Sequence, residues 1–442
     1  MRRLIIAALS VLILLCTPFS YPQGCGLHSI RWTPLMINLL IRTGAPAAAS
    51  PRPVAPPAHA PTSTRGAAPS TQESISLEPG KPVERKLSGR GSHSYKITIN
   101  SGQYLHVVVA QQGIDVAVAL FTPDGKKISE ADSENLIEGS ETLSAIAEAT
   151  GAYMIEVRSV EKTAKIGRYE IKIEELRDAT AEDKYRVAGE LIFREAKRLQ
   201  NGTLEAQRKG IEKYYEALES YRRASDRSGE AGTLNRIGMV YRSLGETREA
   251  LEKFNEALSI SRAIGARKVE AITLNEIGLA YQSLGETRNA LEIFNEALPI
   301  FQAVGARSGE ASAINNIGLA YLSLGETRKA LEKLNEALVI FQAVGARRDE
   351  ATTLSNIGGI SWSLREMQKA LEKYNEALSL SRSLGDRRLE AAILTNIGGV
   401  YDFLGELQKA LEKYNEALPI RRAVGDRLGE AVTLHNIGTS YH

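Results

Sequence analysis

The feature of the sequence that most constrains its fold is a repeat with a period of 40 residues in the second half of the chain. Equivalent positions of the repeat, which we call phases, hold the same type of residue: one phase is aliphatic, the phase four residues later is glycine, and a later phase is alanine. These positions are Leu234, Leu274, Ile314, Leu354, Leu394 and Leu434, then Gly238, Gly278, Gly318, Gly358, Gly398 and Gly438, then Ala250, Ala290, Ala330, Ala370 and Ala410. Repeats of about this length are typical of solenoids, in which each unit buries its apolar faces against its neighbours. The second half is therefore expected to be a stack of similar units.

Each unit is expected to contain two helices. At 100° per residue, Leu234, Ile237, Gly238 and Tyr241 fall on one apolar stripe of the first helix. Gly245 then ends this helix, because glycine readily adopts the left-handed conformation of a C-terminal cap. The second helix repeats small and aromatic residues at Ala250, Phe254 and Ala257.

The unit resembles the tetratricopeptide repeat, which has a bulky residue, a glycine and a tyrosine at the spacing of Leu234, Gly238 and Tyr241. The period is that of the 40-residue variety found in kinesin light chains. This resemblance places an irregular first repeat at residues 180–229, five repeats at 230–429, and the first helix of an incomplete sixth repeat at 430–442. It implies an α-α solenoid whose concave groove binds a peptide or protein partner.

Residues 75–177 follow a different period. Hydrophobic and polar residues alternate in segments such as Tyr95–Ile99 and Tyr153–Val157, and turn-forming pairs such as Asp124-Gly125 separate these segments. Short alternating strands at this spacing predict an antiparallel β-sandwich. The expected fold class is therefore multidomain, an all-β sandwich followed by an all-α tetratricopeptide solenoid.

The turns of this segment resemble those of the bacterial pre-peptidase C-terminal domain family, a small β-sandwich of secreted proteins. The matching residues include Leu77, Pro79, Gly80, Tyr95, Ser101, Gly102, Gly113, Asp115, Pro123, Asp124, Gly125, Gly151, Tyr153, Gly167 and Tyr169. Asp115 and Asp124 are either calcium or sugar ligands or structural turn residues. The structural interpretation is favoured, because aspartate bonds its own backbone in such turns. Cell-wall or glycan binding by the sandwich is kept as a weaker hypothesis.

The start of the chain predicts export. A basic Met1-Arg2-Arg3 precedes the apolar run Leu4–Cys16, which is shorter than the ~20 residues of a spanning helix and matches a secretory signal. Residues 1–24 are therefore expected to be a signal peptide or an N-terminal anchor, and the proline- and alanine-rich residues 25–74 a disordered linker. The expected location is periplasmic, cell-surface or extracellular in a bacterium, with membrane contact only through the N-terminal segment.

Composition argues against several function classes. The chain carries 55 Lys+Arg and 53 Asp+Glu, a net charge of +2, so it has no strong field to attract nucleic acid. Its two cysteines, Cys16 and Cys25, precede the part expected to fold, and its six histidines lack ligand spacing. We find no catalytic constellation, and expect no enzyme activity, no cofactor and no metal.

Helix-wheel positions opposite the apolar stripe of the first helix should face the inner wall of the solenoid, where amides recur. We predict an exposed amide ladder that pairs with the backbone of a bound peptide. The candidate binding residues are Asn235, Arg236, Asn275, Asn315, Asn316, Asn356, Trp362, Asn396, Phe403 and Asn436.

Alternative interpretations of these residues stay open. The amides also fit a solvated polar face or side chains that satisfy turn carbonyls, and Trp362 and Phe403 either anchor a peptide or pack on the next helix. The scarcity of lysine argues against partners with an acidic C-terminus. A second amide series is expected to form hydrogen bonds between helices: Asn255, Asn295, Asn335, Asn375 and Asn415.

Two functions from different classes fit the sequence. The first is an exported protein–protein interaction scaffold. The second is the sensor or regulatory N-terminal portion of a larger caspase-like protease truncated at residue 442, because the domain order resembles the N-terminal part of bacterial CHAT-domain proteins. The last helix has an apolar stripe without a partner helix, and a homotypic contact through it is a further hypothesis.

Overall fold

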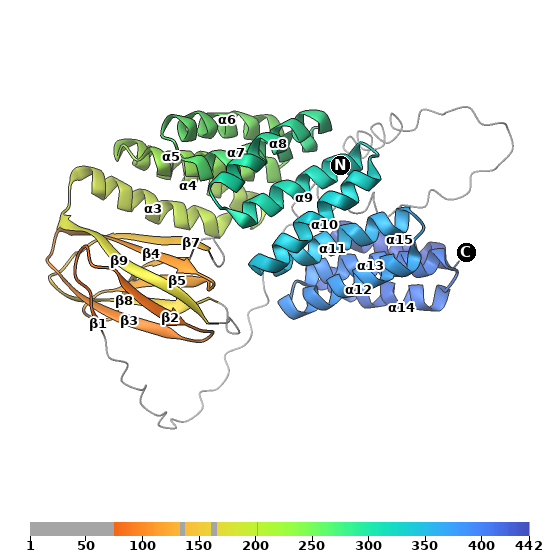
Figure 1. The fold of residues 1–442 in the computed structure, drawn as a ribbon, viewed down its shortest axis with the longest axis horizontal. Coiled ribbons are helices and arrows are strands. Elements are labelled where there is room, and N and C mark those ends of the chain that lie inside the picture. Colours follow the sequence, from red (N-terminus) through yellow and green to blue (C-terminus); the bar gives the residue numbers. More distant parts are fainter. Residues whose placement is uncertain (1–74, 133–137, 161–165, 201, 442) are drawn as a thin grey trace, which may run out of the picture.

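The computed structural model describes residues 75–132, 138–160, 166–200 and 202–441 (Figure 1). The predicted signal peptide or anchor (1–24) and the predicted linker (25–74) lie outside the described residues. The described chain forms two sheets followed by a series of helices, which confirms the predicted fold class.

The N-terminal part is a β-sandwich. Its strands are β1 (Ile75–Ser76), β2 (Val83–Leu87), β3 (Ser92–Ile99), β4 (Gln103–Gln112), β5 (Val116–Phe121), β6 (Lys127–Ala131), β7 (Glu138–Ile146), β8 (Gly151–Ser159) and β9 (Gly167–Asp178). One sheet has the order β1-β3-β8-β5-β6 and the other β2-β9-β4-β7. All the pairings are antiparallel, as predicted, except the parallel pairing of the short β1 with β3.

The core of the sandwich comes from the alternation seen in the sequence. Along β3 and β4, every second residue is buried, and Tyr95 and Val107 have no exposed surface. Tyr95 lies opposite Ile155 of β8 in one sheet, and Val109 lies opposite Ile171 of β9 in the other. The inward side chains of both sheets therefore form one apolar layer.

The C-terminal part consists of paired helices. The helices are α3 (Ala181–Leu199), α4 (Leu204–Arg223), α5 (Arg227–Ser243), α6 (Thr247–Ala263), α7 (Arg267–Ser283), α8 (Thr287–Ala303), α9 (Arg307–Ser323), α10 (Thr327–Val344), α11 (Arg347–Ser363), α12 (Met367–Leu384), α13 (Arg387–Phe403), α14 (Leu407–Ala423) and α15 (Arg427–Ser440). The helices pair in sequence order, α3 with α4 through α13 with α14. Each pair is one repeat, with a first and a second helix.

Two local features of the repeat follow the sequence prediction. Gly245 ends α5 with a φ of 80°, and Arg365 takes the same left-handed conformation (φ 62°) where a repeat lacks the glycine. Gly238 lets the two helices of a repeat approach closely, since a Cβ there would lie 2.6 Å from the Phe254 ring. The sequence pattern thus sets both the turn and the packing of each pair.

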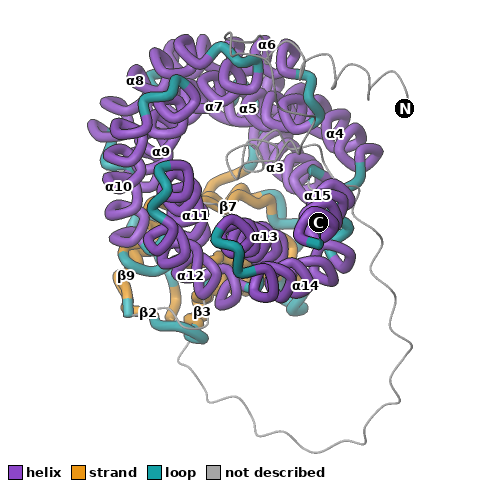
Figure 2. Tube along the Cα trace, turned by 90° about the vertical axis from the view of Figure 1, so that its right-hand side faces the viewer, coloured by secondary structure: helices purple, strands orange, loops and turns teal. Residues whose placement is uncertain are grey.

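The solenoid curves so that first and second helices lie on opposite sides (Figure 2). Helices α5, α7, α9, α11 and α13 line the inner side of the curve, and α6, α8, α10, α12 and α14 lie outside them. Consecutive repeats pack through the second helix of one and the first helix of the next. The inner surface is therefore built almost entirely from first helices.

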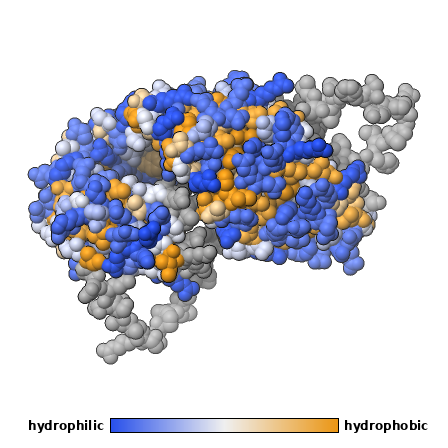
Figure 3. Space-filling view, viewed as in Figure 1, coloured by the Kyte–Doolittle hydropathy of each residue, from blue (hydrophilic) through white to orange (hydrophobic). Residues whose placement is uncertain are grey.

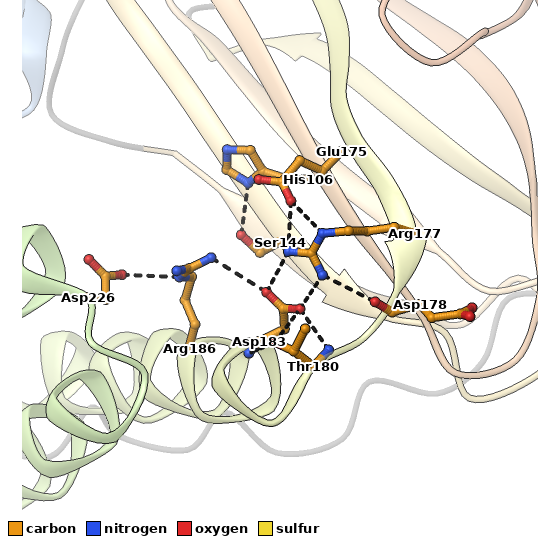
Figure 4. Close-up of polar contacts among 9 residues, drawn as sticks. All are labelled: His106, Ser144, Glu175, Arg177, Asp178, Thr180, Asp183, Arg186 and Asp226. Carbon is orange, nitrogen blue, oxygen red and sulfur yellow. Dashed lines mark hydrogen bonds and ion pairs between the residues drawn. The ribbon is translucent and has the colours of Figure 1, made fainter.

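Helix α3 joins the solenoid to the sandwich. It lies over β7 (Figure 1), and Arg194 donates a hydrogen bond of 2.8 Å to the Ser129 hydroxyl of β6. At its N-terminus, the Asp183 carboxylate accepts bonds from the Arg177 guanidinium of β9 and from the Thr180 backbone N–H, the latter at 2.9 Å (Figure 4). Hydrogen bonding by Arg177 holds the pKa of Asp183 well below its usual range. The two parts are thus connected by an ionic contact as well as by the chain.

Candidate binding surface on the inner helices

The predicted groove residues all lie on first helices. Asn235 and Arg236 belong to α5, Asn275 to α7, Asn315 and Asn316 to α9, Asn356 and Trp362 to α11, Asn396 and Phe403 to α13, and Asn436 to α15. These helices line the inner side of the curve (Figure 2). Whether the residues contact a partner remains a prediction, and the surroundings of each side chain decide what it can do.

The expectation that the amide ladder is exposed is wrong. Asn316 and Asn356 are each 7% exposed, and Asn396 is 1% exposed. Asn235 and Asn315 are also buried, whereas Asn275, Arg236 and Asn436 are half-buried. The cause is the next repeat, because its first helix packs against the flank of the helix that carries the amide.

Several of these amides form hydrogen bonds between consecutive first helices. Asn235 Nδ2 donates to Thr273 Oγ1 at 2.7 Å, and Asn316 Nδ2 donates to Asn275 Oδ1 at 3.0 Å. Between α9 and α11, Thr353 Oγ1 donates to Asn315 Oδ1 at 3.2 Å. Sequence reasoning did not identify the threonines, although they share one phase of the repeat and were therefore detectable.

Three of the inner amides have polar atoms that lack a partner, and one of them is Asn235, whose Oδ1 accepts no hydrogen bond. Asn356 Nδ2 and both polar atoms of Asn396 have no hydrogen-bond partner and are shielded from solvent. A buried polar group without a partner lowers stability by roughly 1–3 kcal/mol. Asn356 and Asn396 occupy the same phase of adjacent repeats, so three of the four unsatisfied inner amide atoms lie on the neighbouring helices α11 and α13.

The fourth repeat supplies two further buried hydroxyl groups without partners, Ser361 Oγ and Tyr374 OH. Ser361 stands where other repeats have tyrosine, and it is fully buried. Burial raises the pKa of the Tyr374 phenol, which is therefore neutral. Buried polar groups on α11, α12 and α13 thus lack the hydrogen-bond partners that such groups usually have in protein interiors.

The two aromatic candidates have different surroundings. The Trp362 indole packs on α13, since a Cβ at Gly399 would lie 2.6 Å from the indole ring. Phe403 is 42% exposed, and the Arg365 guanidinium lies 5.6 Å from the centre of its ring. The packing interpretation therefore holds for Trp362, while Phe403 presents apolar surface beside a cation.

The inner phases around these residues carry little charge. Arg242 and Glu276 form an ion pair at 3.0 Å, linking α5 to α7. From α9 to α13 most inward phases hold small or apolar residues: Ser312, Thr352, Ala392, Leu319, Gly359, Gly399, Ser323 and Ser363. The exception is Asp402, which stands on α13 at the phase of Arg242. This wall offers no cluster of cations for an acidic ligand.

Three amides of the second series bond within their own helix and not between helices, contrary to our expectation. Asn295, Asn335 and Asn375 each donate to the backbone carbonyl four residues earlier in their own helix, at 2.7–2.8 Å. A bond to this carbonyl satisfies the side chain within one helix. These amides lie on second helices, away from the inner wall, so they provide matched controls for the inner series.

The described residues contain no group of three or more His, Cys, Asp or Glu side chains that could hold a metal ion. At Asp124, the carboxylate accepts a hydrogen bond from Thr122 in a turn closed by the bond from the Gly125 N–H to the Thr122 carbonyl (2.9 Å). This contact fits the structural interpretation of Asp124.

No helix among the described residues is both long and apolar enough to cross a membrane.

Residues 204–263, 269–343 and 349–423 match the family model of the tetratricopeptide repeat. The matched helices, α4 to α14, stack as a solenoid of tetratricopeptide repeats. The comparison with curated proteins finds no match.

Several solved structures are similar to this solenoid. BtubC (BKLC) from P. vanneervenii is 20% identical, with a TM-score of 0.42 over 55% of this chain and 92% of its own. A signal transduction ATPase with a tetratricopeptide repeat sensor, from Pyrococcus horikoshii, is 16% identical, with a TM-score of 0.48 over 59% of this chain and 40% of its own. A kinesin light chain structure from Podosopora anserina is 16% identical, with a TM-score of 0.36 over 46% of this chain and 99% of its own.

Proposed function

We propose that this chain is a protein–protein interaction scaffold that holds a peptide or protein partner against the inner helices of its tetratricopeptide solenoid. The observation that carries the proposal is the unsatisfied hydrogen-bonding capacity of Asn356 and Asn396 on adjacent inner helices. An amide both donates and accepts, so it can pair with the N–H and C=O groups of an extended backbone. A bound peptide would supply the partners that these side chains lack.

The surroundings restrict the class of partner. Apart from Asp402, the inner phases of α9, α11 and α13 are small, hydroxylic or apolar, so the contacting segment of the partner should be largely uncharged. Asn396 is almost fully buried in the free chain, and its side chain must rotate before it can bond a ligand. Binding is therefore expected to include a side-chain rearrangement on α13.

The experiment starts from peptides selected on the purified chain from a displayed random library. Calorimetry then compares the wild type with the inner pair Asn356→Ala/Asn396→Ala and with the outer pair Asn335→Ala/Asn375→Ala. The inner pair should bind the selected peptides at least ~10-fold more weakly, about 1.4 kcal/mol, because it lacks the backbone contacts. The outer pair should bind as the wild type does.

Selected peptides that bind the inner pair with unchanged affinity would contradict this function. Circular dichroism of both pairs controls for folding, because each pair carries two Asn→Ala substitutions in helices of two consecutive repeats.

We further propose that the scaffold works outside the cytoplasm. The support is the basic and apolar sequence of Met1–Cys16, which lies outside the described residues. Expression of the full chain in a bacterium, followed by cell fractionation and N-terminal sequencing, tests this location. A chain that stays in the cytoplasm with Met1 intact would refute the proposal.

The alternative function, the sensor portion of a larger CHAT-type protease, rests on the order of the domains alone. The likeness of the sandwich to the pre-peptidase C-terminal family rests on its turn residues, such as Gly80, Gly102 and Gly125. Sequencing the source DNA past the codon for His442 tests this alternative. An open frame leading to a region with a catalytic histidine and cysteine would support it, and a stop codon would exclude it.

A further inference from the structure

Arg85 of β2 is a charged side chain on the inward face of the sandwich. Side chains alternate along β2, and Val83 and Leu87 pack on the apolar core, so Arg85 between them lies on the same face. The neighbouring inward positions of β3, β8 and β9 hold no Asp, Glu, Lys or Arg: His93, Tyr95, Ile97, Ile155, Val157, Ser159, Gly167, Tyr169 and Ile171. Arg85 is therefore the single cation among them.

No carboxylate among the described residues pairs with Arg85, which is half-buried. The adjacent acid, Glu84, lies on the outward face of β2, where its carboxylate is 3.5 Å from Arg168. Charges that a fold removes from water are normally paired. This end of the sandwich thus has the capacity to accept an anion that the chain itself does not supply.

Three side chains beside Arg85 form a row of hydrogen bonds that joins the two sheets. Tyr169, opposite Arg85 in the pairing of β2 with β9, has its hydroxyl 2.6 Å from the Tyr95 hydroxyl and 2.6 Å from His93 Nδ1. Tyr95 has no exposed surface and no other side-chain partner among the described residues, so its hydroxyl donates to Tyr169. The Tyr169 hydroxyl then donates to His93 Nδ1, and the imidazole proton is fixed on Nε2.

The electrostatics of this cluster leave one positive charge without a negative one. Burial, with the charge of Arg85, lowers the pKa of His93, so the imidazole is neutral at neutral pH. Burial raises the pKa of both Tyr95 and Tyr169, although Arg85 acts in the opposite direction, so both phenols are also neutral. No acidic side chain contributes to any of these three shifts.

The cluster is reached from the side of the sandwich away from the solenoid. Helix α3 covers the β7 edge of one sheet, and β2 forms the opposite edge of that sheet (Figure 1). Arg85 and His93 are both half-buried, so their polar ends can meet a ligand from solvent. The sandwich surface is mainly hydrophilic on the face shown in Figure 3, whereas hydrophobic residues gather over the solenoid. These surroundings favour a small charged ligand.

We propose that Arg85 and His93 bind a phosphate group. The Arg85 guanidinium can donate to two phosphate oxygens, and the His93 Nε2–H can donate to a third, whereas a carboxylate offers two oxygens only. Tyr169 and Tyr95 are positioning residues, because they hold the imidazole in the tautomer that donates. Inorganic phosphate and the phosphoryl group of a larger molecule share this chemistry.

Calorimetry of the full chain tests the site with inorganic phosphate, glycerol 3-phosphate and acetate as probes. The wild type should bind inorganic phosphate saturably, and acetate at least ~10-fold more weakly. Arg85→Gln should lose at least ~10-fold in phosphate affinity. Lys86→Gln is the matched control, because it removes an exposed cation from the next position of β2, and it should bind as the wild type does. Tighter binding of glycerol 3-phosphate would identify a phosphate ester as the ligand, and equal binding free phosphate.

Two further measurements separate binding from a structural role. Without phosphate, Arg85→Gln should melt at the same temperature as the wild type or higher, because it removes an unpaired charge. Nitrogen NMR of the His93 ring should show the Nε2–H tautomer, and phosphate should shift the Nε2 resonance in the wild type but not in Arg85→Gln.

Three results would overturn the proposal. The first is a wild type that does not bind phosphate, and the second is acetate binding as tight as that of phosphate. The third is a loss of affinity in Lys86→Gln equal to that in Arg85→Gln, which would show an adventitious ion only. None of these results depends on peptide binding by the inner wall, because both substitutions lie in the sandwich.

Discussion

At the residue scale, residues at one position of the repeat have two different roles in the solenoid. Asn316 and Asn396 occupy the same phase of different repeats, and both are buried. Asn316 donates to Asn275, whereas both polar atoms of Asn396 lack partners. Identical residues in equivalent positions therefore have opposite effects on stability, because the neighbouring repeat supplies a partner in one case only.

This difference predicts opposite results for one substitution. Asn316→Ala should lower the free energy of unfolding by about 1 kcal/mol, because it removes a hydrogen bond and leaves the half-buried Asn275 acceptor without this donor. Asn396→Ala should leave that free energy unchanged or raise it, because alanine removes two unsatisfied polar atoms and favours the helix. Urea unfolding followed by circular dichroism measures both. A loss of stability in Asn396→Ala equal to that in Asn316→Ala would show that the Asn396 amide is bonded in solution.

At the scale of elements, the side chains at the junctions between repeats are complementary in size. Tyr221 lies against Gly229, and Phe301 lies against Gly309, each pair joining a second helix to the next first helix. Where the second helix has a small residue instead, as at Ser261 and Ser381, the next first helix has Val269 or Leu389. The volume at these four junctions is thus kept roughly constant, as close packing requires, whereas Phe341 is followed at the same spacing by Asp349.

The joint between α3 and the sandwich predicts a pH dependence. The Arg177 guanidinium holds the pKa of Asp183 below its usual range, so ionised Asp183 stabilises the folded state. That stability is present above the unfolded pKa of about 4 and is lost as the pH falls towards the folded pKa. Asp183→Asn should lower stability at neutral pH by roughly 1.5–3 kcal/mol, the range for hydrogen bonds to charged groups.

Thermal melts at several pH values test the Asp183 contact. The difference between the wild type and Asp183→Asn should shrink in acid, because the wild type loses the same charge there. A difference that stays constant from neutral to acidic pH would show that the carboxylate charge does not stabilise this joint.

At the scale of the whole molecule, the sequence predicted the architecture well because two strong periodicities determine it. The alternation in Tyr95–Ile99 predicted a strand of the sandwich, and the 40-residue period predicted the helix pairs. The burial of Asn356 and Asn396 was missed for a physical reason. A helix wheel treats one repeat by itself, whereas the first helix of the next repeat covers the flank that carries these amides.

The contacts of the second amide series were missed for a related reason. From its position in the repeat, the Asn375 amide could donate either to a neighbouring helix or to its own backbone. Only the structure shows that it donates to the Leu371 carbonyl. Trp362 shows the converse case, since its packing on Gly399 was one of two interpretations open from the sequence. The period of the sequence thus predicts the helices, but it does not predict which side chains contact each other between repeats.

The central claim, that partners bind the inner wall, is tested most directly by site-specific photo-crosslinking. A photoreactive residue replaces Ser363, which is exposed and at an inward phase of α11, or Val339, which is exposed on the outer helix α10. With a library-selected peptide bound, our account predicts crosslinks from position 363 and none from position 339. Crosslinks from position 339, with none from position 363, would show that the partner binds outside the curve of the solenoid.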